Sequence, residues 1–267
     1  MTYFHKLDQI ARQNQSLLCV GLDTDPAKLP AYFRDKPNGQ LLFNRAIVEA
    51  TAPYVCCYKI NMAFYEAHRH AGLTAVIETL MAIPPEIPVI CDSKRADIGN
   101  TSDQYAQAIF ETLKFDATTV PPYMGYDSLA PFFRHEDKGT YILCLTSNAG
   151  AADFQMVNDL YLRVAEKAQQ WNVAGNIGLV VGATHPSQAV AVREAAPDLP
   201  FLIPGVGAQG GSVAEAAAAA AMKSGRGLVM NASRSVLYAS NGEDYAQAAA
   251  AEANRMRQEI NAALQAM

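Results

Sequence analysis

Three charged side chains within six residues of the sequence have types that could carry acid–base chemistry. Asp92, Lys94 and Asp97 follow an apolar run, Pro88–Cys91, which is typical of a buried strand. Side chains alternate between the two faces of a strand, so we expect Asp92 and Lys94 on the same side at its end and Asp97 on the following loop. An ammonium group between two carboxylates can donate a proton and stabilise developing negative charge. Taken alone, the pattern also suits a surface salt-bridge cluster that caps a helix.

The elements that must position this motif alternate regularly along the chain. Continuously apolar runs are followed by stretches with helical spacing, eight times in 267 residues. Such strands are buried on both faces, as in parallel sheets, and eight strand–helix units in about 250 residues are typical of a (β/α)8 TIM barrel. A doubly wound open sheet, the alternative, would favour a glycine-rich turn after the first strand, which Gly21-Leu22-Asp23 does not provide. We therefore expect a single α/β barrel domain over residues 1–267, beginning with a short helix at residues 3–15.

The boundaries of the expected elements follow from these runs. We expect strands at residues 17–23, 55–61, 88–94, 117–120, 140–145, 177–181, 200–203 and 227–230. We expect helices at residues 41–52, 63–82, 102–113, 128–134, 158–170, 186–195 and 244–266, and one more that contains the alanine run 216–221. Residues 24–40 are too polar and too interrupted by proline for a continuous helix, so we expect a loop there.

Composition excludes several classes of partner. The net charge is −5, from 21 basic and 26 acidic residues, which gives no basic footprint for nucleic acid. The five cysteines lie in apolar runs without a C-x-x-C pair, which predicts buried free thiols and a reducing compartment. No apolar run reaches the ~18 residues of a membrane span, and the amino terminus lacks an apolar signal core. We expect a cytoplasmic protein that binds neither membrane nor nucleic acid.

Polar side chains stand where the predicted strands end, and in a barrel these ends meet at one mouth, where ligands bind. Lys59 is the most informative of them, because it interrupts an apolar strand and a buried ammonium group without a partner is unfavourable. It should pair with Asp23 or Asp92. Asp23 could instead cap a turn, and Ser147 alone is a weak indication. The full set is Asp23, Lys59, Asp92, Lys94, Ser147, Gln209 and Arg234.

Two segments after the last two predicted strands indicate a phosphate site. The glycines of Pro204–Gly211, among them Gly205 and Gly207, let backbone N–H groups approach a ligand, and the next helix adds its positive dipole. Arg234, which ends Asn231–Arg234, can hold phosphate oxygens with its planar guanidinium group. Many barrels bind phosphate with these two loops. The alternative is a merely flexible glycine-rich loop.

With these motifs together, the sequence resembles the orotidine 5′-phosphate decarboxylase family, and in particular its longer-chain, mainly bacterial branch. The resemblance covers the whole chain. It implies a carboxy-lyase that converts orotidine 5′-monophosphate into uridine 5′-monophosphate and carbon dioxide in pyrimidine biosynthesis, with no cofactor and no metal. Ala96 stands where that branch often has glycine. The matching segments are Gly21-Leu22-Asp23, Tyr58-Lys59-Ile60-Asn61, Asp92 to Thr101, Pro204 to Gly211 and Ser233-Arg234.

The resemblance also implies a role for each matching residue. Lys94 would protonate C6 of the pyrimidine as carbon dioxide leaves, within a charge network that includes Lys59, Asp92 and Asp97. In this family the residues matching Asp97 and Thr101 reach the site from the other subunit of a homodimer. Substrate contacts are implied for Asp23, Thr101, Ser147, Pro204, Gly207, Gln209, Ser233 and Arg234.

Two other functions are compatible with parts of this pattern. Related barrels such as 3-hexulose-6-phosphate synthase and 3-keto-L-gulonate-6-phosphate decarboxylase share D-x-K-x-x-D, but they use Mg²⁺ and resemble each other in carrying an acidic residue where this chain has Lys59. A lysine cannot ligate Mg²⁺, which prefers oxygen ligands. A barrel that binds nucleotides without catalysis would be expected to lack Lys94 or one of its carboxylates, and all are present.

Overall fold

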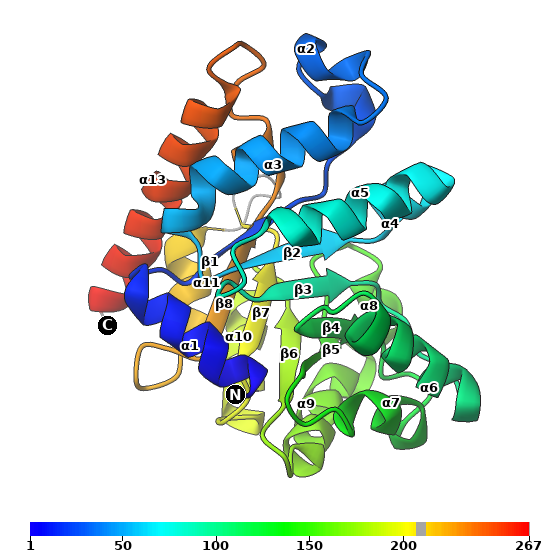
Figure 1. Ribbon diagram of the computed structural model, residues 1–267. Helices are drawn as coiled ribbons and strands as arrows, with labels where there is room; N and C mark the ends of the chain where they lie inside the picture. The colour runs from blue at the N-terminus through cyan, green and yellow to red at the C-terminus, as the bar shows by residue number, and fades with distance from the viewer. Residues whose placement is uncertain (207–211, 267) are drawn as a thin grey trace.

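Eight parallel strands close into a barrel, and helices surround it (Figure 1). The structure is a computed structural model, and it describes residues 1–206 and 212–266. Each strand pairs with its neighbours in sequence, and β1 pairs with β8 to complete the ring. The predicted (β/α)8 TIM barrel is confirmed. The strands are β1 Leu18–Gly21, β2 Cys57–Asn61, β3 Val89–Asp92, β4 Ala117–Val120, β5 Gly139–Leu145, β6 Ile177–Val181, β7 Phe201–Pro204 and β8 Leu228–Ala232.

Helices follow the strands in order and cover the outside of the barrel, where their apolar faces bury the outer faces of the strands (Figure 1). The helices are α1 Tyr3–Gln13, α2 Ala31–Arg34, α3 Gly39–Thr51, α4 Ala63–Glu66, α5 Arg69–Ala82, α6 Gly99–Gln107, α7 Tyr126–Phe133, α8 Ala151–Phe154, α9 Leu160–Trp171, α10 Pro186–Ala195, α11 Val213–Ala220, α12 Arg234–Leu237 and α13 Tyr245–Gln265. Short 3-10 turns lie at Pro26–Lys28, Ala52–Tyr54 and Val157–Asp159, and a π-helical turn lies at Ala108–Thr112.

Helix α1 packs against the end of the barrel at which the strands begin (Figure 1). The hydroxyl of its first residue, Tyr3, lies 3.2 Å from the Tyr141 hydroxyl inside the barrel. Burial raises the pKa of both phenols well above the usual value, so both stay neutral. The Lys6 ammonium group pairs with the Asp116 carboxylate at 2.9 Å. The inside of the barrel at this end is therefore filled by apolar and neutral groups, and the Lys6–Asp116 ion pair is partly exposed.

Four strands end at other residues than predicted. Strand β1 ends at Gly21 instead of residue 23, and β7 ends at Pro204 instead of residue 203. Strand β3 stops at Asp92, and Lys94 lies beyond it with φ of 49°, in the left-handed region. The prediction that Asp92 and Lys94 share one face of a strand was therefore wrong. Strand β8 continues past Met230 to Ala232, because Ala232 still pairs with Val20 of β1.

Other differences lie in the connections between elements. Residues 63–82 form two helices instead of one, because the chain turns after Glu66 and Arg69 has φ of 57°. Residues 24–40 are not a loop throughout, since they contain a 3-10 turn, helix α2 and the start of α3. Helix α12 was not predicted. All five cysteines are buried and free, as expected. Within residues 1–206 and 212–266, no helix has both the length and the apolar character needed to cross a bilayer.

Candidate active site

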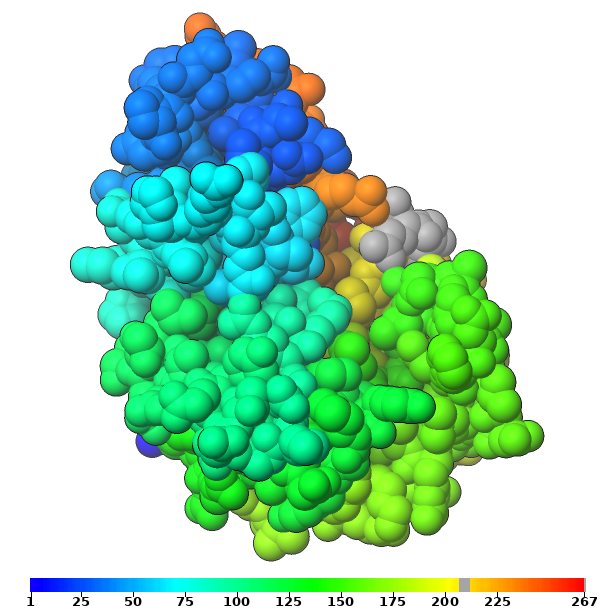
Figure 2. Space-filling view, turned by 90° about the vertical axis from the view of Figure 1, so that its right-hand side faces the viewer, coloured from blue at the N-terminus to red at the C-terminus, as the bar shows by residue number. Residues whose placement is uncertain are grey.

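A cavity of about 590 Å³ opens at the carboxyl ends of the barrel strands. Figure 2 faces this end and shows a hollow between the cyan segment that follows β2, the orange segment that follows β8 and the green loops. Its floor includes the apolar side chains of Leu143, Val180 and Leu202. The structure brings many of the predicted site residues together around it, namely Asp23, Lys59, Asp92, Lys94, Ser147, Pro204, Ser233 and Arg234.

Lys59 lies at the centre of the polar groups, with its side chain only 5 % exposed. Its ammonium nitrogen is 3.1 Å from Oδ1 of Asp23 and 3.4 Å from Oδ2 of Asp92. Strand β2 lies between β1 and β3 in the barrel, so the end of each neighbouring strand delivers one carboxylate to it. The expectation that Lys59 pairs with Asp23 or Asp92 is confirmed, and it pairs with both.

Burial and charge act in opposite directions on this cluster. Burial alone would lower the pKa of Lys59, but Asp23 and Asp92 outweigh it and raise that pKa above the usual value. Burial alone would raise the pKa of Asp92, but the charges of Lys59 and Lys94 and the hydrogen bonds from Lys94 and Thr119 outweigh it and lower the pKa to about 2. Lys59 and Asp92 therefore both stay ionised at neutral pH.

Lys94 extends the network toward the open part of the cavity. Its ammonium nitrogen donates to Oδ1 of Asp92 at 2.5 Å, and its side chain is 46 % exposed. The next residue, Arg95, forms an ion pair with Glu66 of α4 and lies over the ring of Tyr105. The loop after β3 is thus fixed to two helices beside Lys94, whose ammonium group is the more exposed of the two lysines in the cavity.

The other end of the network reaches strand β8. The Ser233 hydroxyl donates to Oδ2 of Asp23 at 2.7 Å and accepts a hydrogen bond from Nδ2 of Asn231 at 3.3 Å. A Cβ atom at position 21 would collide with the Ser233 hydroxyl, so glycine there leaves room for the Ser233 side chain beside Asp23. A continuous set of polar contacts therefore runs from Asn231 to Lys94.

Candidate anion-binding groups lie on the β7–β8 side of the mouth. Arg234 is exposed at the start of α12, and within residues 1–206 and 212–266 its guanidinium group has no hydrogen-bond or salt-bridge partner. Pro204 and Gly205 line the cavity beside it, and Gly205 has φ of 94°. The predicted residues Gly207 and Gln209 lie outside the described residues. Arg234 and the backbone after β7 can together receive an anionic group.

Asp97 and Thr101 are placed differently from the other predicted residues. Oδ1 of Asp97 accepts a hydrogen bond from the backbone N–H of Ile98 at 2.7 Å, and Thr101 is exposed on α6. Neither is among the described residues that line the cavity of their own chain. The geometry of one chain therefore does not bring these two residues to Lys94.

Sequence reasoning missed six polar residues in the cavity, namely Lys28, Asn61, Thr119, Thr146, Asn148 and Asn231. Asn61 comes two residues after Lys59 on β2, so strand alternation places it on the same face and could have identified it. Thr119 lies in a predicted strand as an ordinary β-branched residue, and nothing in the sequence distinguishes it. In the described part of the chain, no three His, Cys, Asp or Glu side chains converge as a metal site.

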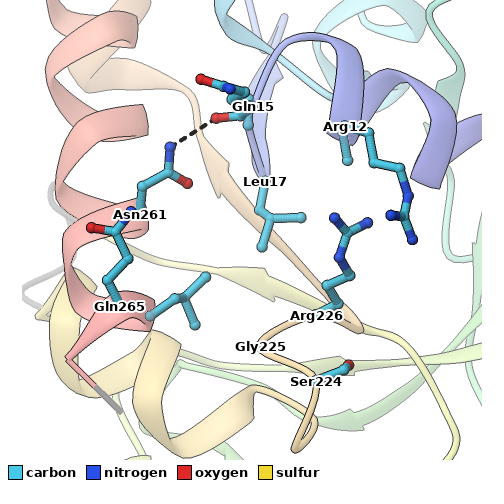
Figure 3. A pocket seen from close by; sticks show the side chains of 11 residues that line it. Arg12, Gln15, Leu17, Ser224, Gly225, Arg226, Asn261 and Gln265 are labelled. Atoms are coloured by element: carbon cyan, nitrogen blue, oxygen red, sulfur yellow. Dashed lines mark hydrogen bonds between the residues drawn. The ribbon is translucent and has the colours of Figure 1, made fainter.

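A second cavity, of about 510 Å³, lies at the opposite end of the barrel between α1, the turn before β8 and the end of α13 (Figure 3). Arg12 and Arg226 face it, and both form ion pairs with Asp8 of α1. Nδ2 of Asn261 donates to the backbone oxygen of Gln15 at 2.8 Å across its rim (Figure 3). The charged groups here satisfy one another on an exposed surface.

The described geometry can be compared with known proteins. The profile of the family described as "Orotidine 5′-phosphate decarboxylase / HUMPS family" matches residues 16–249. The chain belongs to this family. Every described residue that lines the larger cavity falls within the matched segment, whereas Arg12 and Asn261 of the second cavity fall outside it. The family that the sequence resembles is therefore confirmed.

Individual members of the orotidine 5′-phosphate decarboxylase / HUMPS family are similar over the full length. The orotidine 5′-phosphate decarboxylase of Roseiflexus castenholzii is 48 % identical, with both chains fully covered. That of Dehalococcoides mccartyi strain CBDB1 is 49 % identical over 98 % of each chain. Among solved structures, the OMP decarboxylase of Leishmania donovani is 40 % identical and matches with a TM-score of 0.86 over 100 % of both chains.

Proposed function

We propose that this enzyme decarboxylates orotidine 5′-monophosphate to uridine 5′-monophosphate in pyrimidine biosynthesis, as its 48 % identical relative is named to do. The observation that carries the proposal is the alternating network Lys94–Asp92–Lys59–Asp23 at the mouth of a barrel cavity that also holds Arg234. Such a network offers one fixed ammonium group to a reacting carbon, and Arg234 offers a separate cation to a phosphate group.

The reaction needs a cation and a proton at one carbon. When the bond between C6 and the carboxylate breaks, carbon dioxide leaves and the electron pair stays in an in-plane orbital of C6, where no carbonyl can delocalise it by simple conjugation. The ammonium group of Lys94 stabilises that charge and then transfers one proton to C6, which leaves a neutral amine that regains its proton from solvent. No cofactor takes part in this sequence.

The other members of the network hold Lys94 in place. Asp92 lies 2.5 Å from the Lys94 ammonium nitrogen, and this ion pair holds the ammonium group beside the cavity. Lys59 balances the second oxygen of Asp92 and the carboxylate of Asp23, so neither carboxylate is left buried without a counter-charge. In this proposal Asp92 faces the substrate carboxylate, and Asp23 and Lys59 bind the ribose hydroxyls.

The remaining cavity residues bind the rest of the substrate. Ser147 contacts the pyrimidine ring, and Arg234 holds the phosphate with the backbone around Pro204 and Ser233, together with Gly207 and Gln209, which lie outside the described residues. Binding energy from this remote phosphate can be used to stabilise the transition state at C6.

We further infer that two copies of the chain share their sites. Asp97 and Thr101 do not line their own cavity, and exposed apolar side chains lie on the segments that follow the three neighbouring strands β3, β4 and β5. Ile98 is 61 % exposed, Tyr123 88 % and Phe154 67 %, which favours burial against another protein surface. In this arrangement Asp97 and Thr101 complete the partner's site. Mixing Lys94→Ala and Asp97→Asn chains should then restore activity that neither variant has alone.

The five free thiols support a reducing, cytoplasmic location for this enzyme. The main competing function is that of a sugar-phosphate barrel with Mg²⁺. The position of Lys59 argues against it, because the ammonium group lies between the two carboxylates that would otherwise be available to a cation.

One assay separates the two functions. Purified protein is mixed with orotidine 5′-monophosphate in EDTA, and its conversion is followed by the change in ultraviolet absorbance. We expect rapid conversion. Failure in EDTA, together with turnover of a sugar phosphate after addition of Mg²⁺, would overturn the proposal.

A further inference from the structure

Thr119 is a buried residue of β4 whose hydroxyl lies between the backbone and the side chains of the charge network. Its side chain lines the active-site cavity, and the residue is 1 % exposed. The Thr119 hydroxyl donates to Oδ1 of Asp92 at 2.9 Å and accepts a hydrogen bond from the backbone N–H of Lys94 at 3.1 Å. It thus contacts both members of the Lys94–Asp92 pair, from a different strand.

These contacts form a closed ring. The Lys94 backbone N–H donates to Thr119, Thr119 donates to Asp92, and the Lys94 ammonium group donates to the same oxygen of Asp92. Because the threonine oxygen receives the N–H, its single proton is directed at the carboxylate. The ring therefore connects the two ends of the lysine residue, its main chain and its ammonium group, through one hydroxyl and one carboxylate.

The backbone at Lys94 needs such a restraint. Backbone pairing between β3 and β4 extends no further than Cys91 with Thr118. Lys94, three residues later, has φ of 49°, a conformation that is unfavourable for a residue with a Cβ atom. Beyond the last backbone pair, the Thr119 hydroxyl is the group of β4 that holds this main chain. The lysine conformation and the carboxylate direction thus depend on the same side chain.

We propose that Thr119 is a positioning residue that fixes the Lys94 ammonium group over the reacting carbon. This inference rests on the proposed decarboxylation. Thr119 acts through Lys94 and Asp92 and need not touch the substrate at C6. Its loss should therefore slow the chemical step much more than it weakens binding, because the phosphate group is held by Arg234 on the opposite side of the mouth.

The test compares two neighbouring threonines. Thr119→Val removes the hydroxyl at nearly constant volume. Thr118→Val removes an equally buried hydroxyl that bonds the Cys91 carbonyl oxygen and contacts the Ser93 hydroxyl, but bonds neither Asp92 nor Lys94. We expect Thr119→Val to lower kcat by about 10- to 100-fold, the scale of a displacement near 1 Å. KM should change by less than about threefold, and Thr119→Ser, which keeps the hydroxyl, should restore most of the rate.

Each outcome decides one question. If the wild type is active and Thr119→Val has a kcat close to that of Thr118→Val, this inference is overturned and the proposed function stands. If the wild type does not decarboxylate orotidine 5′-monophosphate, the proposed function itself is overturned. An equal loss in both variants, or a rise in KM alone, would assign Thr119 a merely structural or binding role. If Thr119→Val does not fold, as judged by circular dichroism, Thr119→Ala removes the same hydroxyl and carries the same expectation.

Discussion

Two cavities of similar volume, about 590 and 510 Å³, lie at opposite ends of the barrel, and beside each a carboxylate sits between two cations. At the mouth, Asp92 is 11 % exposed and pairs with Lys59 and Lys94. At the base, Asp8 is 44 % exposed and pairs with Arg12 and Arg226. The same arrangement of one carboxylate and two cations is therefore buried at the mouth and exposed to water at the base.

The difference shows what turns a charged cavity into a site. Water screens the exposed trio at the base, where each pair contributes at most ~1 kcal/mol. At the mouth, Lys59 is almost fully enclosed, so its ammonium group interacts strongly with the carboxylates of Asp23 and Asp92. Strands β1, β2 and β3 fix the geometry of these three groups. Volume and formal charge do not distinguish the two cavities, whereas burial and convergence on one exposed ammonium group do.

Removing that ammonium group should have the largest effect. Lys94→Ala should lower kcat by at least ~10³-fold, because it removes the group proposed both to donate the proton and to stabilise the charge at C6. Binding of uridine 5′-monophosphate, measured by calorimetry, should persist through the phosphate site. The matched change at the base, Arg12→Ala, should leave kcat unaltered. Near-wild-type turnover by Lys94→Ala would mean that the proton donor has been assigned wrongly.

The next largest effect should be a difference in stability between variants of the two charged clusters. Lys59→Met leaves Asp23 and Asp92 buried without their shared cation, which should cost about 3–5 kcal/mol of unfolding free energy in urea titrations. Arg226→Met at the base should change it by no more than ~1 kcal/mol, because that pair is exposed. If the two variants lose equal stability, the contrast between buried and exposed clusters does not hold.

A smaller effect is expected on the anion-binding side of the mouth. Arg234→Ala should lower kcat/KM by about 10- to 100-fold, the equivalent of one lost charged hydrogen-bonding group, mainly through KM. Steady-state kinetics with varied orotidine 5′-monophosphate would measure it. A KM that equals the wild-type value would remove Arg234 from the phosphate site.

The smallest difference between the two clusters should lie in how much each carboxylate contributes to the loss of stability in acid. Asp92 has a pKa of about 2 in the folded chain against 3.8 ordinarily, so its pairing stabilises the fold fully above pH 4. This contribution, about 2 kcal/mol, is lost as the pH falls through 2. The gap in unfolding free energy between wild type and Asp92→Asn should narrow over that window. The gap for Asp8→Asn should narrow less, since that carboxylate is more exposed; equal narrowing would contradict the comparison.

Much of the barrel could be predicted because its strands are continuously apolar, and a strand buried on both faces leaves that trace in any sequence. Lys59 was recognisable for the same reason, as a charge within such a run. The end of β3 could not be predicted. The sequence does not show that backbone pairing stops at Cys91 and that the Thr119 hydroxyl bonds Lys94 beyond it, because threonine in a strand normally indicates only β propensity.

Helix α12 escaped prediction for a different reason. It has a single turn, and its four residues are too few to display a helical period. The positions of Asp97 and Thr101 outside their own cavity were also beyond what periodicity can indicate, since they depend on the path of a loop. Family resemblance, and not residue spacing, is what connected these two residues to a second subunit.

The docking of α1 finally imposes an order in time. The hydroxyl partner of Tyr3 is 138 residues further along the chain, and β1 is not enclosed until β8, at residues 228–232, exists. A ribosome needs on the order of ten seconds to pass from Tyr3 to Tyr141. During synthesis α1 therefore emerges well before the residues that cover it, and its apolar face, with Leu7 and Ile10, stays exposed on the nascent chain until they follow.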